Sequence, residues 1–219
     1  PADIRFFARR FVERAAESGP VLLVLDNFEH VVEDLHTLVG IGRREHPGLP
    51  VVMVGHSMGG LLTGRYAQLY QGDLAGAAFL GAVLGDWRWA RRVLEKGIPD
   101  QPSDPEGMSR DPQEVRAYVE DPLVYHGSYK RPLLEAEVAA LDRFNSEIGR
   151  IAVPVLFLHG EADPFVPYRT SLAAVHRMPT PDLTVRVYPG ARHELLNELN
   201  RAEVIGHISE FVVRVTSWV

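Results

Sequence analysis

A serine lies between two glycines in the stretch VVMVGHSMGG, residues 51–60. Gly55, Ser57 and Gly59 follow a run of branched apolar residues and precede a helical pattern, so the G-x-S-x-G spacing falls where a strand turns into a helix. Such a turn holds the hydroxyl at a helix N-terminus, where the Met58 N–H faces any developing negative charge. The sequence predicts a nucleophilic Ser57, with a plain turn serine as the alternative.

The sharpness of this turn restricts the residues around the serine. We predict that side chains at Gly55 and Gly59 would collide with neighbouring backbone, and that the serine itself has a strained backbone conformation. His56 occupies the position before the serine and completes the predicted elbow.

A serine hydroxyl also needs a base and an orienting acid. Asp163, in HGEADPFVP, follows the apolar run VPVLFLHG, and His193, in YPGARHELLNE, follows LTVRVYPG. Taken singly, the two are more simply a capping aspartate and a surface histidine. In the order serine, acid, histidine, each at the carboxyl end of a predicted strand, they predict a catalytic triad.

Alternating strands and helices position these residues. Apolar runs at 21–26, 50–57, 75–83, 153–160 and 183–190 predict buried strands, and amphipathic patterns between them predict helices. A β-α-β rhythm implies parallel strands. We therefore predict an α/β fold with a mostly parallel sheet and flanking helices.

The rhythm is interrupted once, by the proline-rich stretch and helical patterns of residues 84–150. We interpret this segment as an inserted helical lid. Within it, Asp111 is predicted to cap a helix, with Glu114 placed for a capping box. The core then divides into residues 1–83, which carry the elbow, and residues 151–219, which carry the acid and histidine loops.

Composition excludes several classes of function. The 219 residues carry a formal net charge of -6, which argues against nucleic-acid binding, and they contain no cysteine, which excludes thiolate chemistry.

Local sequence features exclude further classes. No apolar run reaches the roughly 18 residues of a membrane span. Charges throughout the first twenty residues are unlike a secretory signal. HELLN, at 193–197, lacks the second histidine of a zinc motif. We expect a small-molecule partner, no metal or cofactor, and a cytoplasmic location.

Four stretches together resemble the monoacylglycerol lipase group of α/β-hydrolases, notably its actinobacterial members. They are HPGLPVVMVGHSMGG, SRDPQEVRAYVEDPLVYHG, HGEADPFVP and YPGARHELLNE, and the resemblance runs from about residue 28 to the C-terminus. It implies that Ser57 is the nucleophile, His193 the general base and Asp163 its partner, with the Met58 N–H as an oxyanion donor.

The same resemblance implies an acyl pocket beneath the lid. Trp87, Trp89 and Val93 are then candidates for apolar contact with a lipid chain, although aromatic residues of a lid more often pack against its own helices.

The resemblance is incomplete at the N-terminal end. Members of the group carry further strands ahead of this point, with a His-Gly loop that donates a second oxyanion N–H, and neither that loop nor a G-H-G-x-S turn occurs in this sequence. We expect an N-terminally shortened fold, or replacement of the lost half by residues 1–26. The pattern favours a strand over 21–26 beside 51–55. If that edge stays unpaired, we expect homodimers through it.

Two hypotheses follow. The first is a serine ester hydrolase that acts on monoacylglycerol or other short to medium acyl esters through an acyl-enzyme on Ser57. The second is a catalytically impaired homologue without a working oxyanion hole, which acts at most as a binding module. The arginine-bearing amphipathic helix predicted near the N-terminus packs on the domain or makes transient contact with a membrane surface.

Overall fold

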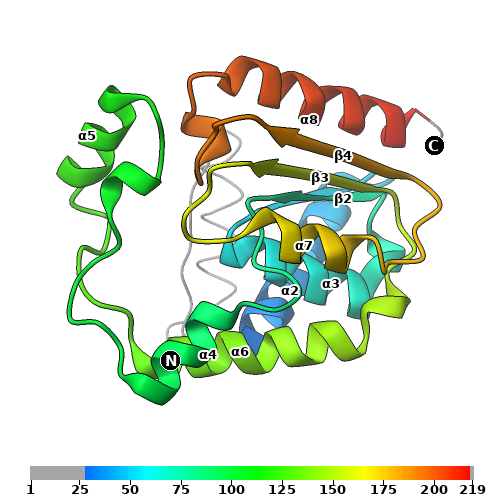
Figure 1. Ribbon diagram of the computed structural model, residues 1–219. Helices are drawn as coiled ribbons and strands as arrows, with labels where there is room; N and C mark the ends of the chain where they lie inside the picture. Colours follow the sequence, from blue (N-terminus) through cyan, green and yellow to red (C-terminus); the bar gives the residue numbers. More distant parts are fainter. Residues whose placement is uncertain (1–27, 218–219) are drawn as a thin grey trace.

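The computed structural model describes residues 28–217, and its strands form one sheet. Strands β1 (Val52–His56), β2 (Gly76–Leu80), β3 (Val155–Gly160) and β4 (Leu183–Tyr188) pair in the order β1-β2-β3-β4, and every pair is parallel (Figure 1). The predicted α/β fold with a parallel sheet is confirmed. The strand predicted at 21–26 and the N-terminal helix lie outside the described residues.

Helices flank this sheet on both faces. The α-helices are α2 (Phe28–Glu45), α3 (Met58–Tyr70), α4 (Arg88–Lys96), α5 (Pro112–Glu120), α6 (Arg131–Ser146), α7 (Tyr168–Val175) and α8 (Arg201–Thr216). Short 3-10 helices are η1 (Gln71–Asp73), η2 (Pro105–Gly107), η3 (Ile148–Arg150) and η4 (Leu195–Asn197).

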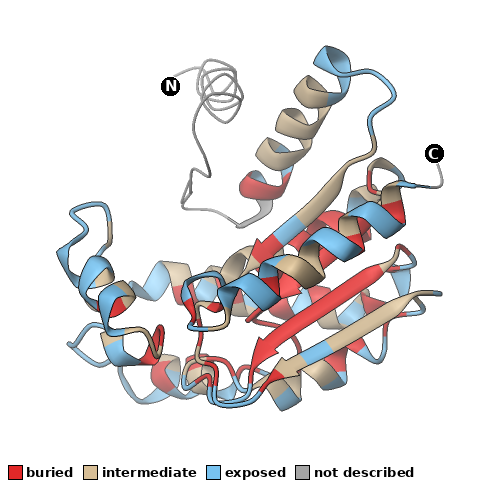
Figure 2. Cartoon of the chain, turned by 90° about the horizontal axis from the view of Figure 1, so that it is seen from above, coloured by how far each residue is buried: buried red, intermediate tan, exposed pale blue. Residues whose placement is uncertain are grey.

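Side chains alternate between the two faces of the inner strands, as strand geometry requires. Phe79 and Phe157 pack toward the face covered by α3, α6 and α7, whereas Leu80 and Leu158 pack with Phe211 of α8 on the other. The inner strands β2 and β3 are buried, while the edge strand β4 is mostly of intermediate burial (Figure 2). Because helices cover both faces, every residue of β2 and β3 is buried, and His159 is the one polar side chain in these two strands.

The segment interpreted as a lid holds α4, α5 and α6. Helix α5 stands away from the sheet (Figure 1), whereas α6 packs on α3 and contributes Phe144 to the core. Asp111 caps α5 as predicted, because its carboxylate accepts the Gln113 N–H at 2.9 Å. The predicted capping box is wrong. Glu114 forms an ion pair with Arg201 of α8 at 3.1 Å instead, which draws it away from the helix start.

Strand β1 pairs with β2 alone within residues 28–217. Its Val54 side chain is 44% exposed. Dimerisation through this edge stays a prediction. In the same range, no helix combines the length and the apolar character that a membrane crossing needs.

Candidate active site

Strand β1 turns into helix α3 at Ser57. This residue has φ 54° and ψ -121°, and it is the only non-glycine residue of the described range with a positive φ. Such a conformation costs about 1–3 kcal/mol. Hydrogen bonds hold it in place: the Ser57 N–H donates to the Leu80 carbonyl at 2.9 Å, and the Ser57 carbonyl accepts the Val83 N–H at 3.1 Å. The predicted strained turn is confirmed.

Close packing around the elbow explains one of its two glycines. A Cβ on Gly55 would overlap the Gly59 carbonyl oxygen and Thr63 Oγ1, as predicted. The prediction for Gly59 is wrong, because a Cβ there would meet nothing within 4 Å. The constraint falls on Gly60 instead, where a Cβ would overlap Ala82 just past β2. The residue of α3 that packs closely against this end of the sheet is therefore Gly60 and not Gly59.

Three predicted residues converge at the carboxyl ends of β1, β3 and β4. The Ser57 Oγ lies 2.9 Å from His193 Nε2, and His193 Nδ1 lies 2.7 Å from Asp163 Oδ2. The other oxygen of Asp163 accepts the N–H groups of Phe165 and Val166 at 2.9 and 3.0 Å. This arrangement can pass a proton from the hydroxyl to the imidazole and hold the imidazolium beside a carboxylate.

The surroundings shift the pKa values of Asp163, which His193 contacts through Nδ1, and of His56, whose ring lies beside that of His193. Burial alone would raise the pKa of Asp163, but the hydrogen bond and charge of His193 and the Val166 N–H outweigh it, and the net pKa is lowered. Burial, and then the charge of His193, lower the pKa of His56 to about 3. His56 is therefore neutral and does not compete for the proton. The Nδ1 atom of His56 lies 3.1 Å from the Leu80 carbonyl oxygen.

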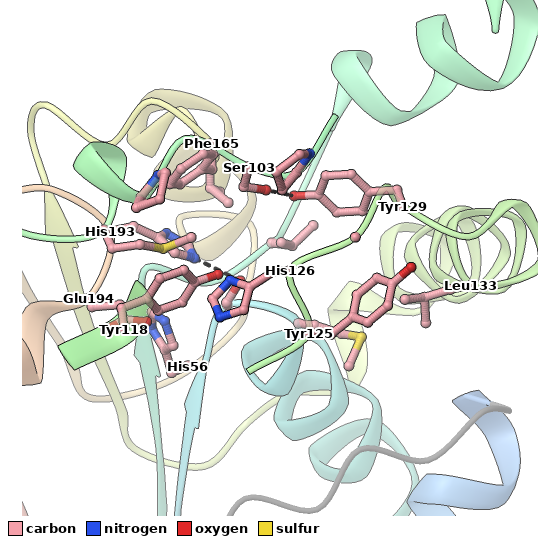
Figure 3. Close-up of a pocket in the computed structure, with 18 of the residues that line it drawn as sticks. His56, Ser103, Tyr118, Tyr125, His126, Tyr129, Leu133, Phe165, His193 and Glu194 are labelled. Carbon is pink, nitrogen blue, oxygen red and sulfur yellow. Dashed lines mark hydrogen bonds between the residues drawn. The ribbon is translucent and has the colours of Figure 1, made fainter. Parts of the chain in front are cut away.

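A cavity of about 600 Å³ opens at Ser57. Its lining is mostly apolar and aromatic, and Figure 3 shows Tyr118, Tyr125 and Tyr129 around it. Its size is that of a small-molecule site. Of the predicted lipid contacts, Trp87 lines this cavity, and Trp89 lines a neighbouring one of about 450 Å³. Val93 is buried in the core and lines neither cavity.

Sequence reasoning missed one wall of the cavity, on helix α6. Leu133 and Glu137 line it from one face of the helix, four residues apart, and Lys130, the N-cap residue of α6, lines it as well. The signal was present, but a glutamate in an amphipathic helix usually faces water, whereas Glu137 is 4% exposed.

A fully buried carboxylate, that of Glu198, ties the inserted segment to the histidine loop. It accepts hydrogen bonds from Arg110 Nε at 2.8 Å, from the Arg192 N–H at 2.7 Å and from the Leu199 N–H at 3.0 Å. Burial would raise the pKa of Glu198, but these donors lower it. Because Arg192 precedes His193, this network also positions the His193 backbone.

Replacing Glu198 with alanine is expected to lower the free energy of unfolding by about 3–5 kcal/mol, since its donors lose their buried partner. Urea denaturation of both proteins measures the change. Glu210→Ala, at an exposed position of α8, is the matched control and is expected to change stability by less than about 0.5 kcal/mol. Equal effects of the two substitutions would contradict the role of this network.

The buried carboxyl group of Glu137 is expected to make stability depend on pH. Burial raises its pKa from 4.5 to about 8, so between these values the unfolded chain releases a proton that the folded protein keeps. Wild-type stability should therefore fall, relative to Glu137→Gln, as the pH rises from about 4.5 to 8. Thermal melts at pH 5 and pH 9 test this. The exposed Glu135→Gln is the control, and a pH-independent difference for Glu137→Gln would refute the expectation.

Comparison with known proteins decides the family. A family model described as "Serine aminopeptidase, S33" matches residues 15–200. A monoacylglycerol lipase of Mycolicibacterium smegmatis is 31% identical over 206 residues, which cover 90% of this chain and 74% of the relative. The chain belongs to the monoacylglycerol lipase-like α/β-hydrolases.

Further relatives agree with this assignment. Human monoglyceride lipase is 29% identical over 208 residues, covering 90% of this chain and 68% of the relative. The crystal structure of a Paleococcus ferrophilus monoacylglycerol lipase matches with a TM-score of 0.73 at 25% identity, over 86% of this chain and 76% of that one. The family of this monoacylglycerol lipase-like hydrolase consists of serine esterases and lipases, and the predicted resemblance is confirmed.

Proposed function

We propose that this hydrolase cleaves monoacylglycerols or related short to medium acyl esters through an acyl-enzyme on Ser57. The observation that carries the proposal is the hydrogen-bonded series from Ser57 through His193 to Asp163, with contacts of 2.9 and 2.7 Å. The names of the mycobacterial and human relatives, monoacylglycerol lipase and monoglyceride lipase, support the substrate class.

The proposed reaction has two half-reactions, and in each of them His193 acts first as a base and then as an acid. His193 Nε2 takes the proton of Ser57 as its Oγ attacks the ester carbonyl carbon, and Asp163 stabilises the imidazolium. The Met58 N–H, first of helix α3, faces the oxyanion. His193 then gives the proton to the departing alcohol, and a water molecule repeats the sequence to release the acid.

The cavity supports a role for residues 84–150 as a lid between two core parts, 1–83 and 151–219. Trp87, together with Met58 and Val83, presents an apolar wall to an acyl chain. Val119 and Tyr125, which line the cavity, are 50% and 62% exposed, and Leu123 between them in the sequence is 92% exposed. These exposed apolar residues support transient contact of this part of the segment with a lipid surface.

A fluorophosphonate probe tests the proposal, together with hydrolysis of p-nitrophenyl butyrate and of monolaurin by the purified full chain. The wild type and Ser103→Ala, which removes another serine of the same cavity, should be labelled and active, whereas Ser57→Ala should be neither. A wild type that melts cooperatively, yet shows no labelling and no turnover, would refute the proposal and favour the alternative of an impaired homologue that only binds.

A further inference from the structure

Two carboxyl groups line the cavity without a part in the proposed reaction: that of Glu194, which accepts a hydrogen bond from Asn197, and that of Glu137 on α6. Only Glu137 is buried. It is 4% exposed and lines the same cavity as Ser57 and His193. Within residues 28–217, no hydrogen bond or ion pair reaches this carboxyl group, and burial is the sole influence on its pKa. An unpartnered polar group in an apolar wall is unfavourable until something in the cavity hydrogen-bonds to it.

The cation at the start of α6 does not satisfy it. Lys130, the N-cap residue of this helix, precedes Glu137 by about two turns, or about 10 Å along the helix axis. Its ammonium group sits over the Tyr125 ring, 5.2 Å from the ring centre. Because its pKa is raised to about 8, the Glu137 carboxyl is protonated at neutral pH and can both donate and accept one hydrogen bond. A hydroxyl group has this same pair of capacities.

The position of α6 indicates which part of a substrate reaches Glu137. The reacting carbonyl must lie between Ser57 and the Met58 N–H, and the leaving alcohol must lie near His193, which returns its proton. Helix α6 packs on α3, which begins at Met58, and on α4. Figure 3 shows Leu133, one turn from Glu137 on the same face, across the cavity from His193. The acyl chain is therefore the part that extends toward α6.

We propose, on the basis of the ester hydrolase function above, that Glu137 selects acyl chains that carry a hydroxyl group, which hydrogen-bonds to its carboxyl inside the cavity. Hydroxylated acyl esters are then the preferred substrate class. An unsubstituted chain of the same length leaves the carboxyl group buried without a partner, and a site built in this way discriminates against such an analogue.

The test compares kcat/KM for p-nitrophenyl decanoate with that for the same ester hydroxylated on its third, sixth or tenth carbon. In the wild type, at least one hydroxylated ester should be preferred. Glu137→Leu should lower that preference about 10- to 100-fold, and Glu137→Gln, which keeps a donor and an acceptor, should retain most of it. Glu135→Gln, an exposed carboxylate on the same helix, should leave it unchanged.

A second arm of the test varies the alcohol part of the ester and keeps the acyl chain, by comparing ethyl decanoate with glycerol monodecanoate. Glu137→Leu should leave this ratio unchanged. A change confined to this arm would overturn the assignment to the acyl chain, and equal ratios for wild type and Glu137→Leu in both arms would overturn the role of Glu137. Both results require turnover of the plain esters, so they are distinct from failure of the ester hydrolase function itself.

Discussion

Replacing Ser57 with alanine is expected to lower kcat for p-nitrophenyl butyrate about a million-fold, the scale on which a serine hydrolase loses rate without its nucleophile. The substitution removes the Oγ that lies 2.9 Å from His193 Nε2, so no acyl-enzyme forms. Residual hydrolysis would come from substrate binding and the Met58 N–H alone. Steady-state kinetics on purified wild type and variant measure the loss.

The fold should survive this change, because alanine keeps the backbone hydrogen bonds of Ser57 to Leu80, Gly60 and Val83. Thermal melts of the two proteins should therefore differ by only a few degrees. Ser103→Ala serves as the activity control. If Ser57→Ala kept a tenth or more of the wild-type kcat, Ser57 would not be the nucleophile.

The triad could be predicted from sequence because each member follows a strand of unmistakable pattern. Parallel strands bring their carboxyl ends to one edge of the sheet. The meeting of Ser57, Asp163 and His193 therefore follows from the strands alone and does not depend on the structure of the lid. Conversely, the sequence does not indicate which of Gly59 and Gly60 has no room for a side chain. Both follow the serine, and only the rotation of α3 on the sheet decides which of them lies against Ala82.

The inserted segment was harder to predict because the burial of its side chains depends on how its helices pack on the core. By its spacing, Glu137 lies on the same face of α6 as Leu134, Leu141 and Phe144, but the pattern alone does not show that a glutamate there faces a cavity and not water. Val93 was predicted to contact lipid, but α4 packs on α6 and directs this side chain inward. Such choices depend on tertiary packing, which local pattern does not contain.

Replacing Asp163 with asparagine is expected to lower kcat/KM about 10,000-fold, although the side chain keeps its shape. The amide oxygen can still accept the Phe165 and Val166 N–H groups. The amide NH2 group must then face His193 Nδ1, which becomes an acceptor and moves the ring proton to Nε2. Ser57 then faces a donor where it needs an acceptor.

Rate and thermal stability together distinguish a loss of His193 orientation from a loss of the folded structure. Fluorophosphonate labelling should slow with kcat/KM in Asp163→Asn, because both reactions need the same hydroxyl activation, while the thermal melt should stay cooperative. Glu161→Gln, an exposed carboxylate in the same loop, should change neither rate. A loss smaller than tenfold in Asp163→Asn would mean that the 2.7 Å contact to His193 orients nothing that the reaction requires, and another group would have to hold the imidazole.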